Sequence, residues 1–358
     1  MYGIFGLLCR KGEYEISDEA KGLIKEHFDN LCTVKDSSFA NGRTVRNLFE
    51  KIISKQASRI ASEKLITREL LSTIEAEDVQ CCLGEEKKEE KLEDVLQELN
   101  SLIGLKTAKE EIEELIYLVQ NQKKRRDQGL KIPSLSLHLV FTGNPGTGKT
   151  TVARLIARIY KCLGLLSKGQ LIETDRSGLA AGYVGQTAMK TKQIIQTAIG
   201  GVLFIDEAYT LAEGGSDDFG QEAIDTLLKA MEDERENFVV IVAGYNDQMN
   251  GFIHSNPGLE SRFNRYIHFE DYSAEQMYSI FRSLCDRNQY VLTEDAVRKL
   301  RGYFSEADIV GLGNGRGARN LFERVVTQQA KRIERCPNAE ADLQEINAED
   351  IVEAMGRD

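Results

Sequence analysis

The sequence predicts an α/β fold in which a parallel sheet carries helices on both faces, with a helical domain before and after it in the chain. Three observations lead to this prediction. Residues 135–272 alternate apolar, strand-like segments with amphipathic helical ones. A glycine-rich loop joins the first of these strands to the next helix. A segment of about 75–80 residues near the beginning recurs near the end.

The repeat identifies the two helical domains. Residues 41–60 read NGRTVRNLFEKIISKQASRI and residues 314–333 read NGRGARNLFERVVTQQAKRI, with twelve of twenty positions identical. Residues 1–9 match 277–285 at six of nine positions, and IEAEDV at 74–79 corresponds to INAEDI at 346–351. The segments 17–28 and 293–304 each open with a Ser or Thr cap and early acids, as helices do. We therefore expect related all-α domains at 1–80 and 273–358, a charged linker at 81–94 and a core at 95–272.

The core elements follow in order. Residues 106–128 are expected to form a helix, because glutamates lie early and Lys and Arg late, which suits the helix dipole. Strands are expected within 135–143, 201–208 and 238–245, and helices within 150–164 and 220–233. Strands that alternate with helices in this way form a parallel sheet.

The composition argues against proteins that bind nucleic acid, cross a membrane or hold a transition metal. The net charge of −11 argues against nucleic acid as the default partner, because phosphate backbones bind basic faces. No run approaches the ~18 apolar residues of a membrane span, and the start lacks the features of a signal peptide. The seven cysteines contain no C-x-x-C pair and the four histidines have no metal-ligand spacing. We expect a cytoplasmic protein with reduced thiols, no transition metal and no membrane partner.

The glycine-rich loop predicts a nucleotide site. Residues 143–150, GNPGTGKT, fit G-x-x-x-x-G-K-[ST] between a strand and a helix. Its backbone N–H groups would close around phosphates at a helix N-terminus. Lys149 would reach the β and γ phosphates, and the Thr150 hydroxyl would bind Mg²⁺. The predicted nucleotide-binding residues of this loop are Asn144, Pro145, Gly146, Thr147, Gly148, Lys149, Thr150 and Thr151.

An acidic pair predicts the chemistry. The apolar segment VLFIDE at 202–207 ends in Asp206 and Glu207. Asp206 would hold Mg²⁺ through its water shell, and Glu207 would orient or deprotonate the attacking water. Phosphoryl transfer depends mostly on positioning and charge neutralisation, which this pair and a metal can supply.

These motifs resemble the AAA+ ATPases, most closely the group that contains stage V sporulation protein K and red-type Rubisco activase. The resemblance covers residues 95–355 and includes LIGL (102–105), NPGTGKTTVAR, GYVGQTAMKT, GGVLFIDEAYTL, VVIVAGYNDQM, NPGLESRF and GNGRGARNLFERV. It implies Mg²⁺-dependent ATP hydrolysis, a core followed by a helical lid, and assembly into rings, by resemblance hexamers.

The resemblance also implies individual roles. Gly104 would lie near the adenine, and Asn246 would act as the first sensor of the γ phosphate. Arg262, or alternatively Arg265, would be the arginine finger that reaches a neighbouring subunit. Tyr183 would lie on the first pore loop and grip a substrate polypeptide.

In the lid, Arg316, or alternatively Arg319, would be the second sensor. The first copy carries Arg43 and Arg46 at the matching positions without a preceding phosphate loop. We interpret it as a lid without its own core, the remnant of a second module. The rival interpretation is that it docks on the core and blocks or imitates a neighbour.

The expected function is therefore ATP-driven remodelling or threading of a protein substrate whose identity the sequence does not reveal. Two alternatives remain: a Rubisco-activase-type remodeller with one dedicated client, and an ATP-dependent switch or scaffold that threads nothing.

Overall fold

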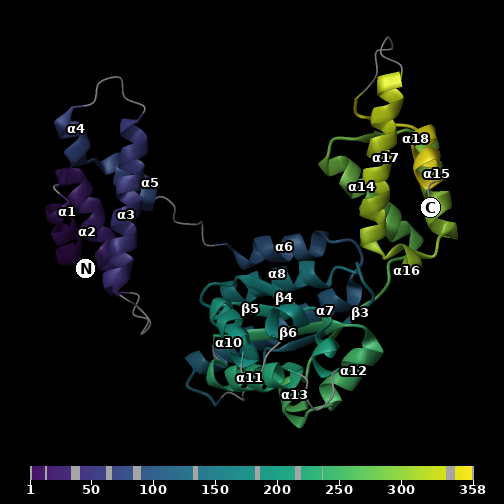
Figure 1. Cartoon of the computed structure of the whole chain (residues 1–358), viewed down its shortest axis with the longest axis horizontal. Coiled ribbons are helices and arrows are strands. Elements are labelled where there is room, and N and C mark those ends of the chain that lie inside the picture. Colours follow the sequence, from purple (N-terminus) through teal and green to yellow (C-terminus); the bar gives the residue numbers. More distant parts are fainter. Residues whose placement is uncertain are drawn as a thin grey trace. The chain divides into compact units, whose positions relative to one another are not determined.

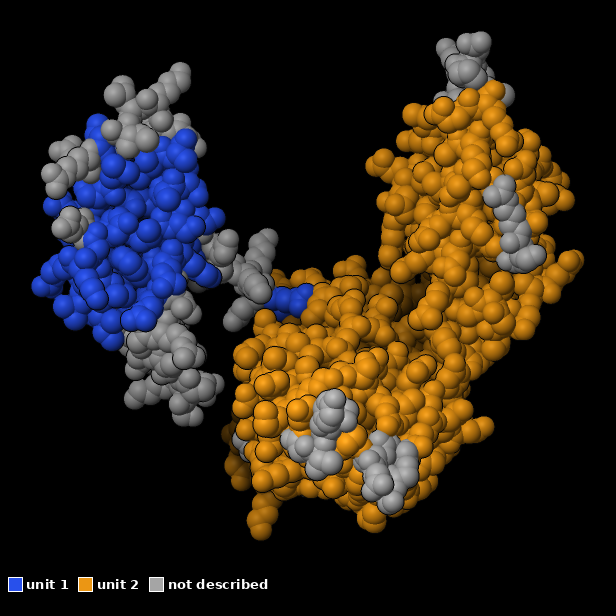
Figure 2. Space-filling view, viewed as in Figure 1, with its two compact units in different colours: residues 1–90 blue, residues 91–358 orange. Residues whose placement is uncertain are grey.

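The computed structural model describes residues 2–12, 14–33, 41–61, 67–83, 90–131, 136–181, 186–213, 219–235, 237–335 and 343–356. The chain forms two compact units, residues 1–90 and residues 91–358, coloured separately in Figure 2. The described helices and strands are labelled in Figure 1.

Unit 1 is a small helical domain with its own core. Its buried residues include Phe5, Ile24, Phe28, Val45 and Ile52. A short parallel strand pair, which the all-α expectation did not include, joins Glu15–Ile16 to Thr73–Ile74. The elements are α1 (Tyr2–Lys11), β1 (Glu15–Ile16), α2 (Asp18–Thr33), α3 (Asn41–Ile60), α4 (Arg68–Ser72), β2 (Thr73–Ile74) and α5 (Ala76–Leu83).

Unit 2 begins with α6 (Leu92–Ser101) and α7 (Lys106–Asp127), followed by a five-stranded parallel sheet. Helices α5 and α6 extend into the two ends of the expected linker, and Leu92 at the α6 end packs against the core. In space the strands are ordered β4-β5-β6-β3-β7, so the first strand of the sheet lies between the last two. They are β3 (Leu139–Gly143), β4 (Leu171–Thr174), β5 (Val202–Ile205), β6 (Val239–Gly244) and β7 (Tyr266–Phe269).

Helices cover both faces of this sheet (Figure 1). Because strand side chains alternate between faces, Phe141 and Phe204 pack with α6, α7 and α8 (Lys149–Cys162), whereas Val140 and Leu203 pack on the opposite face. The elements packed on that second face are α9 (Arg176–Leu179), α10 (Gln186–Ala198), η1 (Ala208–Ala212), α11 (Phe219–Asp233), α12 (Asn246–His254) and α13 (Pro257–Arg262). The result is the predicted three-layer α/β core.

A helical lid follows the core in unit 2. Met277, Phe281, Leu300, Phe304 and Val325 are among its buried residues. Its elements are α14 (Ala274–Arg287), β8 (Val291–Leu292), α15 (Glu294–Glu306), α16 (Ile309–Leu312), α17 (Gly315–Arg335), β9 (Glu345–Ile346) and α18 (Ala348–Met355). As in unit 1, a two-residue parallel strand pair closes the domain.

The two repeats share their internal contacts as well as their sequence. Gln56 donates hydrogen bonds to the backbone of the segment before α5, and Gln329 does the same before α18. Arg59 binds the buried carboxylate of Asp78 at 2.7 Å, and Arg332 binds that of Asp350 at 2.9 Å. The residues that the two repeats share at these positions therefore stabilise the helical domain in which each lies.

Candidate nucleotide-binding site

The phosphate loop, which is the glycine-rich segment 143–150, turns from β3 into α8 through glycines whose φ angles lie in the left-handed region. Gly146 has φ +74° and Gly148, the N-cap of α8, has φ +97°, which an L-residue rarely adopts. The Lys149 ammonium donates to the carbonyl oxygens of Gly143 and Asn144, each at 2.8 Å. The Thr147 hydroxyl also donates to the Asn144 carbonyl, at 2.8 Å. Burial lowers the pKa of Lys149, whereas the nearby Asp206 carboxylate acts in the opposite direction.

The acidic pair lies at the end of β5, where the strand leaves the sheet. The Asp206 N–H donates to the Thr174 carbonyl at 2.9 Å, which fixes the turn after the strand. Glu207 has φ +47°, a conformation that is strained for a residue other than glycine and is often found at functional sites. Its own N–H donates to Asp206 Oδ1 at 3.1 Å, and its carbonyl accepts from the Thr210 hydroxyl at 2.7 Å.

A cavity of about 650 Å³ brings the phosphate loop, the acidic pair and the lid arginines together. Thr150 and Asp206 both line it, so a hydroxyl and a carboxylate oxygen are available there for a hard cation such as Mg²⁺. The predicted residues that line it are Pro145, Gly146, Gly148, Lys149, Thr150, Thr151, Asp206, Glu207, Arg316 and Arg319. Leu102, Ile103 and Leu105 line it too, whereas Gly104, at φ +66°, packs on Tyr272 and Gln276.

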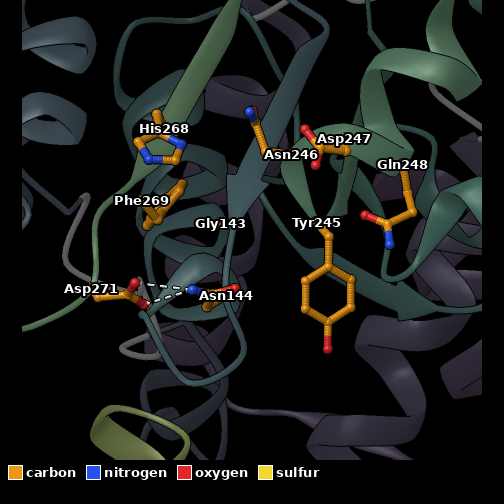
Figure 3. A pocket seen from close by; sticks show the side chains of 9 residues that line it. All are labelled: Gly143, Asn144, Tyr245, Asn246, Asp247, Gln248, His268, Phe269 and Asp271. Carbon is orange, nitrogen blue, oxygen red and sulfur yellow. Dashed lines mark hydrogen bonds between the residues drawn. The ribbon is translucent and has the colours of Figure 1, made fainter. Parts of the chain in front are cut away.

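A second cavity, of about 260 Å³, adjoins the phosphate loop (Figure 3). Asn246, the expected first sensor, lines this second cavity with Asn144 and His268 and does not line the larger one. Tyr245 lines both, and Figure 3 shows the Tyr245 and Asn246 side chains pointing away from each other. Thr147 is fully buried and lines neither cavity.

The remaining predicted residues lie elsewhere. Arg262 binds Glu232 on α11 at 3.2 Å, and its side chain is 28% exposed. Arg265 is half-buried just before β7, and neither arginine lines either cavity. Tyr183 and the side chain of Arg43 lie outside the described residues, and Arg46 is exposed.

Three residues whose side chains hydrogen-bond to the phosphate loop were not predicted. Asp271, Tyr272 and Asn314 contact the phosphate loop from the hinge between β7 and the lid and from the start of α17. Burial raises the pKa of Tyr272 to about 12. The triplet NGR, identical in both repeats, could have indicated a role for Asn314, but the resemblance to the family implies a role only for its arginine.

Similarity to known proteins agrees with this geometry. The family described as "ATPase family associated with various cellular activities (AAA)" matches residues 139–271, and the AAA lid domain matches both 1–91 and 273–358. Stage V sporulation protein K of Bacillus subtilis (strain 168) is 43% identical over 272 residues, which cover 74% of this chain and 84% of that protein. A chloroplastic ribulose bisphosphate carboxylase/oxygenase activase of Cyanidioschyzon merolae is 41% identical over 278 residues, which cover 76% and 95%.

Among solved structures, the FIGL-1 AAA domain in complex with ADP aligns with a TM-score of 0.50 and 19% identity over 71% of this chain and 82% of that one, a likeness of fold. The chain therefore belongs to the AAA family of ATPases, and it is an enzyme that binds and hydrolyses ATP. None of the helices in the described part of the chain combines the length and apolar character that crossing a membrane requires.

Proposed function

We propose that this ATPase uses Mg²⁺-dependent hydrolysis to remodel or thread a protein substrate, as a homo-oligomeric, hexameric ring in the cytoplasm. The observation that carries the proposal is the cavity of about 650 Å³ that is lined by the phosphate loop, the acidic pair and two lid arginines. Hydrolysis at such a site changes what the lid contacts, and this movement can do work on a partner.

The chemistry is assigned to residues that line this cavity and, for Asn246, the adjoining one. Lys149 and the loop N–H groups bind the phosphates, and Arg316 or Arg319 approaches them from the lid. Thr150 and Asp206 would hold Mg²⁺, which neutralises phosphate charge when bound. Glu207 orients or deprotonates the attacking water, and Asn246 senses the γ phosphate from the adjoining cavity.

Ring assembly is supported by the arginine on α13. Arg262 lies outside both cavities of its own chain, and its guanidinium binds Glu232. In the proposed ring it would exchange this partner for the phosphates in the site of a neighbour. Such a finger makes hydrolysis depend on assembly. We also propose the domain boundaries 1–80, 81–94, 95–272 and 273–358, with Gly104 beside the adenine.

The decisive experiment concerns Tyr183. Tyr183→Ala is expected to retain ATP binding and to abolish remodelling of a captured client, because the pore aromatic grips the polypeptide. The client can be identified by pull-down with Glu207→Gln, which binds ATP and hydrolyses almost none. Unchanged activity of Tyr183→Ala on that client would favour the switch or scaffold instead.

One specific alternative is favoured by the similarity to the chloroplastic activase: a remodeller dedicated to Rubisco. Its test is restoration of activity to inhibited Rubisco by this chain and ATP. A failure there, together with a different client in the pull-down, would exclude that alternative and leave the broader proposal intact.

A further inference from the structure

We infer that Asp271 and Asn314 are positioning residues that hold the phosphate loop in its nucleotide-binding shape from outside the loop. The inference concerns nucleotide binding itself and does not depend on remodelling or ring assembly.

The carbonyl groups of three consecutive loop residues are held by the hinge and lid. The Pro145 carbonyl accepts from Asn314 Nδ2 at 3.4 Å, and the Gly146 carbonyl accepts from the Gly315 N–H at 3.1 Å. The Thr147 carbonyl accepts from the Tyr272 hydroxyl at 3.2 Å. All three donors therefore come from residues that follow the sheet in the chain.

These contacts determine where the loop N–H groups point. In a trans peptide the N–H of one residue points opposite to the carbonyl of the residue before it, and the described chain contains no cis peptide. With the three carbonyls turned toward hinge and lid, the N–H groups of Gly146, Thr147 and Gly148 point the other way. Within the described residues these N–H groups have no hydrogen-bond acceptor. Gly146 and Gly148 line the larger cavity, so their N–H groups are suited to bind phosphate oxygens there.

Asp271 joins the loop to the lid. Its carboxylate accepts from Asn144 Nδ2, at 3.0 Å and 2.9 Å to its two oxygens, as the dashed lines in Figure 3 mark. It also accepts from Asn314 Nδ2 at 2.8 Å. A carboxylate that accepts amide N–H groups forms stronger hydrogen bonds than a neutral acceptor does. Asp271 thus ties the first turn of the loop to the start of α17.

Asn314 is specialised for this junction. It is fully buried, and its φ of +54° is one that asparagine tolerates better than most residues do. Its Oδ1 accepts from the Tyr272 N–H at 3.0 Å, so both ends of its amide are used. Its side-chain partners all precede the lid in the chain, whereas Gln329 and Arg332 bind residues within the lid.

The test measures ATP binding and steady-state hydrolysis of the full chain carrying Asn314→Gly, which removes the amide and tolerates the positive φ. We expect the Kd and KM for ATP to rise about tenfold, the effect of losing one charge-assisted hydrogen bond. We expect kcat at saturating ATP to change less than about threefold, because the loop binds ground state and transition state alike.

Two matched controls separate positioning from general destabilisation. Asn41→Gly makes the same change in the repeat whose unit contains no phosphate loop, and Asp350→Asn weakens the lid away from the nucleotide. Both should keep wild-type affinity. Asn314→Asp should bind ATP more weakly, because it sets two carboxylates against each other and leaves the Pro145 carbonyl without its donor. Wild-type affinity in Asn314→Gly, or an equal loss in Asp350→Asn, would overturn the inference.

Discussion

Replacing Gly146 by alanine should separate the phosphate loop from the lid. A Cβ built on Gly146 would lie 2.1 Å from the Gly313 carbonyl oxygen, and Cβ contacts under 3.0 Å essentially do not occur. The loop and the start of α17 must therefore move apart by about 0.9 Å or more. The left-handed conformation adds roughly 1–2 kcal/mol for alanine, and the lost Gly315–Gly146 hydrogen bond adds about 1 kcal/mol.

ATP binds to the native conformation of the loop, so the free energy that the substitution costs this conformation appears largely as lost ATP affinity. A total of about 2–3 kcal/mol corresponds to ATP binding weaker by roughly 30- to 150-fold. Isothermal titration of ATP into Gly146→Ala measures it directly. Gly164→Ala is the matched control, because Gly164 has φ +76° with no atom within 4 Å of a built Cβ. Equal ATP affinities of the two variants would refute the reasoning.

Three further predictions concern the acidic pair, the core and unit 1. Glu207→Gln should bind ATP normally and lose almost all hydrolysis in a phosphate-release assay; retained turnover would mean that the base lies elsewhere. Burial lowers the pKa of His138 from its ordinary 6.5 to about 4, so the unfolded chain takes up a proton between these values and stability falls as the pH falls through that window. His138→Gln should reduce the pH dependence of the free energy of unfolding by up to about 1.4 kcal/mol per pH unit, measured by urea unfolding at pH 7 and pH 5. An unchanged pH dependence would exclude His138 as its source. Asp78→Asn should destabilise unit 1 by about 3 kcal/mol in the same assay, because it leaves Arg59 beside an uncharged, buried partner; an unchanged midpoint would mean that the pair adds nothing.

The sequence predicted the parts of the site that depend on local spacing. Short motifs at the ends of apolar strands indicate the glycine positions of the loop, Lys149 and the pair Asp206–Glu207. Both acids and Lys149 line the larger cavity. The α/β class followed from the alternation of strands and helices, and it is confirmed.

The contacts between distant segments were beyond sequence reasoning. Nothing in the spacing relates Asp271 to Asn144, because 127 residues separate them and neither belongs to a periodic pattern. The NGR triplet was interpreted through its arginine, although Asn314 is the member that is fully buried. Likewise, sequence alone does not say that Tyr245 lines both cavities, whereas its neighbour Asn246 lines only the smaller one.

The distances along the chain between the phosphate loop and its supports have a consequence for biogenesis. The Thr147 carbonyl accepts from a donor 125 residues further along the chain, and the Pro145 carbonyl accepts from one 169 residues further along. During synthesis from the N-terminus, the loop therefore leaves the ribosome long before the residues that shape it, and such long-range contacts form late in folding. Nucleotide affinity should consequently report on completion of the lid, and a nascent chain that ends before α17 should carry the whole motif without a finished binding site.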